Sequence, residues 1–201
     1  MSSFAVRPAR PEDFTQIAII ANYYIENSLA TFRTERVDRA ALLDTFYSVV
    51  EQRLPYIVSV AFDDPDEPFV LGYAYASRYR PERDAYRHTA ELSIYVHPDH
   101  LSAGIGSLML DNLLGLLRQS STPSLLLGPV AEESTPIRQV LAVMALDTEG
   151  YKGGYGQRDW YVKRGFVQVG QLREVGHKFG RWIDTIILQL SLHSDGGATS
   201  H

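Results

Sequence analysis

The chain has 201 residues, which is the ordinary size of one compact domain and enough to bury a core. Its 45% hydrophobic and 21% charged residues exclude a disordered chain. The net charge of -5 gives no overall positive field for nucleic acid or an anionic membrane. The lack of cysteine excludes disulfides and cysteine-bound zinc, and no segment approaches the about 20 apolar residues of a membrane helix. We therefore expect a soluble, cytoplasmic protein that binds neither nucleic acid nor a membrane.

The first half of the sequence alternates between strand and helix patterns. Strands are expected where β-branched and aromatic residues concentrate, and helices where apolar residues recur at helical spacing. In chain order, this predicts a strand at Phe4–Pro8, helices from Pro11 to about Asn27 and over Val37–Gln52, and strands at Tyr56–Phe62, Phe69–Tyr79 and His88–Val96. The acidic residues 63–68 read as a hairpin turn, which favours antiparallel pairing of the strands beside it.

The second half begins with a glycine loop and a helix through Leu108 and Leu117. Three prolines make residues 120–138 a structured insertion without a regular element. The remaining predictions are a strand at Gln139–Leu146, a flexible glycine loop over 150–156, a short helix at Asp159–Arg164, and strands at Val167–Val175 and Trp182–Leu192 around a turn at Lys178–Gly180. We expect one α/β (α+β) domain over residues 1–192, with a central, mixed but mostly antiparallel sheet flanked by helices, and a disordered tail over 193–201.

The segment from Glu91 to Gly106 runs from a strand through a glycine loop into a helix. Such a loop offers several backbone N–H groups to one anion, and the helix dipole adds favourable charge, so a phosphate or diphosphate would fit. The loop lacks the Lys-Ser/Thr pair of a nucleotide-binding P-loop, and Met109 breaks the dinucleotide-binding glycine spacing. An ordinary turn that uses glycine for its dihedral freedom explains the same residues.

This segment resembles motif A of the GNAT N-acetyltransferases, which hold the diphosphate of acetyl-CoA with an Arg/Gln-x-x-Gly-x-Gly/Ala loop. Leu101 stands where that family prefers arginine or glutamine, so only the backbone part of the motif is present. The resemblance implies that acetyl-CoA is the co-substrate and that backbone groups of two segments bind it. The residues implied are Ile94, Tyr95 and Val96 for the pantetheine, and Ser102, Ala103, Gly104, Ile105, Gly106 and Ser107 for the diphosphate.

Residues 84–91 and 172–184 are similar to the phosphinothricin and methionine sulfoximine acetyltransferase branch. The branch implies a small amino-acid-like amine as acceptor, a homodimer, and Glu91 as the general base. The chemistry agrees, because a protonated amine cannot attack a thioester until a group removes its proton. The alternative for Glu91 is a solvated strand face or an ion pair with Arg78 or His88.

The run from Tyr161 to Phe166 is similar to the Tyr-x-x-x-Gly-Phe helix ending of the GNAT superfamily. The resemblance implies that Tyr161 protonates the departing CoA thiolate; a core aromatic residue is the alternative. The similarity of residues 30–34 and 79–81 to the phosphinothricin branch implies acceptor contacts for Phe32 and Arg80, and Thr89 is expected to position the substrate or Glu91. A core phenylalanine, a solvated loop arginine and an ordinary strand threonine are the corresponding alternatives.

Two other functions remain open at this stage. One keeps the reaction but changes the acceptor to a polyamine, an arylamine or a protein N-terminus. The other is a non-catalytic acyl-CoA sensor, which the missing side-chain ligand at Leu101 and the glycine at 154, where the family usually has asparagine, would suit. The six histidines have no metal-ligand spacing, so we expect no metal.

Overall fold

A computed structural model describes residues 4–61, 68–119 and 135–192. These residues fold into seven strands and four α-helices, joined in places by short 3₁₀ turns. In chain order these are β1 (Phe4–Pro8), α1 (Phe14–Asn27), α2 (Arg39–Glu51), β2 (Tyr56–Ala61), β3 (Phe69–Arg78), β4 (Thr89–Val96), α3 (Ile105–Arg118), β5 (Gln139–Leu146), α4 (Tyr155–Val162), β6 (Val167–Lys178) and β7 (Arg181–Ser191).

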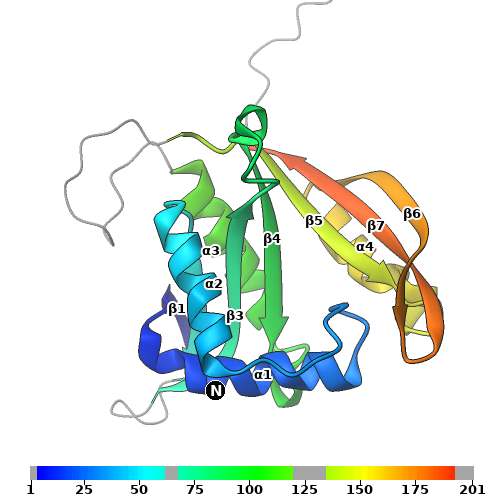
Figure 1. Ribbon diagram of the computed structural model, residues 1–201, viewed down its shortest axis with the longest axis horizontal. Helices are drawn as coiled ribbons and strands as arrows, with labels where there is room; N and C mark the ends of the chain where they lie inside the picture. The colour runs from blue at the N-terminus through cyan, green and yellow to red at the C-terminus, as the bar shows by residue number, and fades with distance from the viewer. Residues whose placement is uncertain (1–3, 62–67, 120–134, 193–201) are drawn as a thin grey trace, which may run out of the picture.

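The strands form one sheet in the order β1-β2-β3-β4-β5-β7-β6, and every neighbouring pair is antiparallel except β4 and β5. The parallel pair is short, because only Thr89–Leu92 of β4 matches Gln139–Ala142 of β5. Beyond Leu92 the two strands diverge, and Figure 1 shows them opening like a V toward the C-terminal end of β4. The sheet therefore has a gap between β4 and β5 beyond Leu92.

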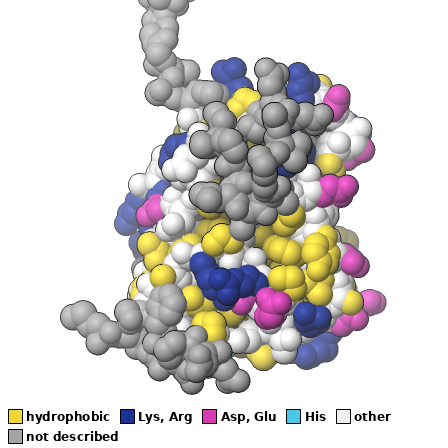
Figure 2. All heavy atoms as spheres, turned by 90° about the vertical axis from the view of Figure 1, so that its left-hand side faces the viewer, with side chains coloured by type: hydrophobic (Ala, Val, Ile, Leu, Met, Phe, Trp, Pro, Cys, Tyr) yellow, Lys and Arg dark blue, Asp and Glu magenta, His cyan; other side chains and the backbone are white. Residues whose placement is uncertain are grey.

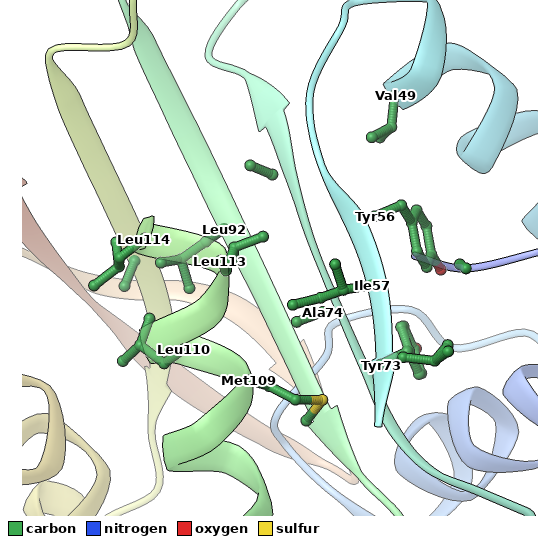
Figure 3. Packing of buried hydrophobic residues seen from close by; sticks show 14 of the residues in the cluster. Val49, Tyr56, Ile57, Tyr73, Ala74, Leu92, Met109, Leu110, Leu113 and Leu114 are labelled. Carbon is green, nitrogen blue, oxygen red and sulfur yellow. The ribbon is translucent and has the colours of Figure 1, made fainter. Parts of the chain in front are cut away.

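Helices cover the two faces of the first four strands. On one face Met109 and Leu113 of α3 lie toward Ile57 and Leu92, and these four side chains are buried, as is Leu110 of α3 (Figure 3). We call this the α3 face. The opposite face, which we call the α2 face, carries Tyr56 and Tyr73 against Val49 of α2, as Figure 3 also shows. Strand alternation therefore decides which helix each β3 and β4 residue meets.

Local sequence explains where the helices begin. The Asp38 side chain accepts a hydrogen bond from the Ala41 backbone N–H at 2.8 Å, which caps α2. Gly104 precedes α3 with a φ of 84°, a left-handed conformation that suits glycine. Buried Asp13 binds Arg7 through both carboxylate oxygens, at 2.7 and 2.8 Å, and so ties β1 to the start of α1.

The predicted mixed, mostly antiparallel sheet flanked by helices is confirmed. Two local predictions were wrong. The helix expected at Asp159 begins at Tyr155 and includes Gly156, so the flexible loop is shorter than the glycines suggested. Strand β6 continues to Lys178, which reduces the hairpin turn to Phe179 and Gly180. Most of the predicted turn at 63–68, most of the insertion at 120–138 and the tail at 193–201 lie outside the described residues.

The surface seen from the left of Figure 1 mixes charges of both signs. Figure 2 shows basic and acidic side chains interspersed there with apolar ones. Among the described residues, no helix has both the length and the apolar character needed to span a bilayer.

Candidate active site

The gap between β4 and β5 exposes main-chain groups of β4. The Tyr79 N–H donates to the Thr89 carbonyl at 3.0 Å, and the His97 N–H donates to the Leu71 carbonyl at 2.7 Å. These bonds fix the phase of the β3–β4 ladder, so the main chain of Tyr95 faces β3. The amides of Ile94 and Val96 point the other way, into the gap. Of the predicted pantetheine ligands, these two therefore offer backbone groups and Tyr95 offers its side chain.

Glu91 lies beside the point where β4 leaves β5. Its strand partners are Ser77 in β3 and Leu141 in β5, and alternation puts its carboxylate on the α2 face. The side chain is half-buried and makes no hydrogen bond or ion pair with the described residues. Burial raises the pKa of Glu91 above its usual value. An unpaired carboxylate with a raised pKa is suited to accept a proton.

The expected ion-pair partners of Glu91 are engaged elsewhere. An Arg78 guanidinium nitrogen donates to the carbonyl of Arg87, and the His88 ring nitrogen Nδ1 lies 2.8 Å from the carbonyl of Pro136. Neither is paired with Glu91. Glu91 therefore does not form the ion pair with Arg78 or His88 that was the alternative to a catalytic role.

The loop before α3 forms the concave turn expected of an anion site. Ser102 and Gly104 both have positive φ, 64° and 84°. None of the backbone N–H groups from Ser102 to Ser107 donates to an acceptor among the described residues. A Cβ added at Gly104 would meet nothing within 4 Å, so the space beside this glycine is open. Leu101 is 55% exposed and adds no polar group. These free donors fit a diphosphate.

Tyr161 of α4 is buried beside this loop and the gap. Its ring packs against Trp160 and Phe166 with centroids 4.7 and 5.1 Å apart. Burial, followed by the nearby Tyr95 phenol, raises the pKa of Tyr161 well above the usual value, which keeps its hydroxyl protonated. No hydrogen bond joins its hydroxyl to another described residue, so the protonated phenol is free to donate one.

A small cavity of about 40 Å³ opens on the α2 face between the sheet and the loop that joins α1 to α2. It is large enough for a few water molecules or one small polar substituent. Burial raises the pKa of Tyr95 to about 12, so its phenol also stays protonated. The polar lining is Thr31, Arg33, Thr45, Tyr56, Tyr73, Tyr75 and Tyr95. Through Tyr75, which lies diagonally across the ladder from Glu91, this cavity neighbours the carboxylate.

The α1–α2 loop is fastened to the β6–β7 hairpin. The buried Lys178 ammonium donates to the carbonyls of Ser28 and Thr31 at 2.7 and 2.8 Å. The Phe32 ring lies so close to Gly176 that a Cβ there would be 2.4 Å away. Phe32 is thus held by contact with β6 and remains partly exposed, so it is not a core phenylalanine.

Arg80 and Thr89 lie at the other end of β4. Arg80 is exposed in the β3–β4 loop, with a φ of 49° and its guanidinium 5.2 Å from the centre of the Tyr79 ring. Thr89 is half-buried at the start of β4, opposite Gln139 of β5. No contact within the described chain joins either side chain to Glu91.

The geometry has counterparts among known proteins. Residues 6–187 match the model of the acetyltransferase (GNAT) domain family. The chain is 33% identical to a phosphinothricin N-acetyltransferase of Alcaligenes faecalis, covering 94% of this chain and 83% of that one. It is 32% identical to an L-methionine sulfoximine/L-methionine sulfone acetyltransferase of Pseudomonas aeruginosa, covering 94% and 95%. The chain belongs to the GNAT acetyltransferase family.

Solved structures agree with this family. A phosphinothricin acetyltransferase from Sinorhizobium meliloti, solved in complex with acetyl-CoA, superposes with a TM-score of 0.75 at 28% identity and covers 99% of this chain and 97% of its own. A Salmonella typhimurium putative acetyltransferase with its cofactor acetyl-CoA gives 0.78 at 25% identity, covering 96% of each chain. The protein is a GNAT N-acetyltransferase, and the resemblance of its sequence to this family is confirmed.

Sequence analysis of this GNAT domain missed several residues of the site. The tyrosines that line the cavity are the clearest case. Tyr73 and Tyr75 are two residues apart in β3 and therefore lie on the same face of the sheet, a spacing that is visible in the sequence. Arg33 lines the same cavity, and Arg164 reaches the first turn of α3. For the two arginines the sequence holds no signal, since only the tertiary fold brings them there.

Proposed function

We propose that this enzyme transfers the acetyl group of acetyl-CoA to the amine of a small amino-acid-like acceptor of the phosphinothricin, methionine sulfoximine or methionine sulfone type. One domain over residues 1–192 carries this activity. The observation that supports it most directly is Glu91, an unpaired, half-buried carboxylate at the apex of the β4–β5 gap. The names of the relatives supply the acceptor class.

Acetyl-CoA fits the groups available around the gap. Free N–H groups from Ser102 to Ser107 would hold the diphosphate, aided by the positive end of α3. The amides of Ile94 and Val96 would pair with the pantetheine as a strand would, since β5 has turned away there. The Val96 carbonyl already accepts a hydrogen bond from the Tyr24 hydroxyl at 2.7 Å. The Val96 N–H would therefore be the group of this residue that pairs with the pantetheine.

Two side chains assist the reaction in this mechanism. Glu91 accepts a proton from the acceptor ammonium, directly or through one water, and so frees the lone pair that attacks the acetyl carbon. Tyr161 donates a hydrogen bond to the sulfur and stabilises its developing negative charge as the C–S bond breaks. The raised pKa values suit these roles, because Glu91 becomes a stronger base and Tyr161 keeps the proton of its hydrogen bond.

The acceptor would lie on the α2 face between Glu91 and the tyrosine cavity. Phe32 supplies an apolar wall, held in place by Gly176. In this arrangement Arg80 binds the acceptor carboxylate, and Thr89 at the start of β4 orients the amine. Arg33 adds positive charge at the cavity. The phenols can donate hydrogen bonds to an oxygen-rich end group such as a sulfone or phosphinate.

An acceptor panel with a thiol-release readout tests this function. We expect phosphinothricin, methionine sulfoximine and methionine sulfone to be acetylated with higher kcat/KM than polyamines, arylamines or peptide N-termini. Faster turnover of amines that lack a carboxylate would assign a different acceptor. Tight binding of acetyl-CoA without turnover of any amine would identify an acyl-CoA sensor instead.

The active form would be a cytoplasmic homodimer. The support is a set of exposed apolar side chains on β6 and β7, among which Val167 is 64% exposed and Trp182 and Val175 are also more than half exposed. A second copy of the chain would cover them. Sedimentation velocity should show a dimer that Val167→Lys weakens; a monomeric wild-type protein would contradict this assembly.

A further inference from the structure

Arg164, just beyond α4, brings a guanidinium group to the first turn of α3. Its Nη2 donates to Ser107 Oγ, and Trp160 Nε1 donates to the same hydroxyl oxygen at 3.3 Å. Nη1 donates to the Trp160 carbonyl at 2.9 Å, and the guanidinium lies 4.2 Å from the centre of the Trp160 ring. Three contacts thus fix this side chain beside the loop that has free backbone donors.

At this position two sources of positive charge lie side by side. The N-terminal end of α3 carries positive partial charge, and a guanidinium beside it adds charge of the same sign. The ion pair that Arg164 makes within the described chain is weak, because the Asp111 carboxylate is 4.0 Å away and 68% exposed. A bound anion between the guanidinium and the free N–H groups would relieve this repulsion. Ser107 can also donate to it, since its oxygen already accepts twice.

We propose that Arg164 is a ligand of the diphosphate of CoA, contributed by the turn that follows α4 rather than by the loop before α3. It supplies the cationic fork that Leu101 does not. The inference rests on the proposed function, because it assumes that CoA occupies the loop. Arg164 then also links cofactor binding to α4, the helix that carries Tyr161.

Calorimetric titration with CoA, dephospho-CoA and pantetheine tests the inference without relying on turnover. A phosphate contact of this kind changes affinity by about tenfold. Arg164→Gln should therefore raise the Kd of CoA and of dephospho-CoA about tenfold and leave the Kd of pantetheine unchanged. Arg164→Lys keeps the charge but loses the fork, so it should give an intermediate Kd. Arg158→Gln is the matched control within α4, because Arg158 binds Asp159 at 2.6 Å, and it should change none of the three.

The outcomes separate the alternatives. An equal loss for pantetheine would show that Arg164 only ties α4 to α3 and would overturn the proposal. If Arg164→Gln weakened the binding of CoA but not of dephospho-CoA, Arg164 would contact the 3′-phosphate, and the diphosphate assignment would be overturned. Wild-type protein that binds no CoA would overturn the proposed function itself. Should Arg164→Gln not fold, Arg164→Lys decides, and a wild-type Kd for CoA in that variant contradicts the role of the fork.

Discussion

The two arms of the sheet are built differently. The N-terminal arm, which we define as β1–β4 with α1–α3, is covered on both faces and holds most of the buried core. The C-terminal arm, β5–β7 with α4, is covered by a helix on the α3 face but leaves Val143, Val167 and Leu172 exposed. Only four residues of β4 pair with β5 across the boundary. The site occupies this boundary, because there backbone groups and a carboxylate are left free without a loss of core.

This division explains how one domain can be both stable and open. The N-terminal arm supplies the buried core that supports Glu91 and the loop before α3. The C-terminal arm contributes Tyr161 from α4 and Arg164 from the turn that follows it, across the gap. If β4 and β5 paired along their full length, the amides of Ile94 and Val96 would form hydrogen bonds with β5. In the proposed function, substrate binding therefore depends on the separation of β4 from β5 beyond Leu92.

The largest expected effect is at the boundary itself. Glu91→Gln removes the proton acceptor and should lower kcat/KM by about 100-fold or more near pH 7. The defect should shrink as pH rises, because the acceptor amine then loses its proton in solution. A pH–rate profile measures this: wild-type activity should fall as pH drops through the raised pKa of Glu91, and the variant should lack that limb.

Glu82→Gln is the matched control, because it makes the same chemical change in an exposed loop. It should keep wild-type turnover, and unaltered turnover of Glu91→Gln would reject the base assignment. The folded state favours the neutral form of Glu91, so its stabilising effect exists at low pH and is lost as pH rises through the folded-state pKa. Glu91→Gln should accordingly unfold at the same or a higher temperature than wild type at neutral pH.

The same substitution in each arm tests the structural comparison. Leu113 of α3 is 0% exposed and Leu172 of β6 is 47% exposed. Leu113→Ala should cost about 2–5 kcal/mol because it leaves a cavity in the core. Leu172→Ala should change the free energy of unfolding of the monomer by about 0.5 kcal/mol or less. Urea unfolding at low protein concentration measures both, and equal losses would show that the two arms are equally packed.

Tyr161→Phe should have a smaller effect on catalysis than Glu91→Gln. A thiol has a pKa of about 8.5, so the thiolate leaves with little help and the loss in kcat should be about tenfold. Tyr155→Phe in the same helix is the control and should keep wild-type kcat. If both variants turn over equally well at saturating acetyl-CoA, Tyr161 is only a core aromatic residue.

The sequence predicts the N-terminal arm better than the C-terminal arm, for a physical reason. Buried helices and strands impose clear periodicities, so the helices through Phe14 and Leu113 and the strands of the sheet follow from pattern alone. In the C-terminal arm β6 has exposed apolar residues and irregular register, and its residues after Leu172 were expected only as far as Val175. The glycines before α4 hid the true start of that helix.

The candidate site divides in the same way. Glu91 and the loop from Ser102 to Ser107 belong to one continuous segment, so a local motif predicts them. The contacts of Lys178 with the α1–α2 loop and of Arg164 with Ser107 join residues far apart in sequence. Residue spacing cannot predict such contacts, because they depend on how the two arms pack against each other.

The smallest expected effect concerns a buried polar group inside the well-packed arm. Ser59 of β2 is fully buried, and its hydroxyl has no partner among the described residues. Ser59→Ala removes an unpaired group, so stability should stay the same or rise by about 1 kcal/mol. Buried Asn22 gives the contrast, because it donates to the Val37 carbonyl at 2.9 Å and accepts from the Val37 N–H at 2.8 Å.

Asn22→Ala should therefore cost about 2 kcal/mol or more, since it leaves both backbone groups of Val37 unpaired. Thermal unfolding of the two variants compares them directly. A loss for Ser59→Ala as large as for Asn22→Ala would mean that the Ser59 hydroxyl is satisfied in solution, for example by a buried water. The bulge between Ser59 and Val60, where β2 shifts register against β3, would then be the place where that water enters the sheet.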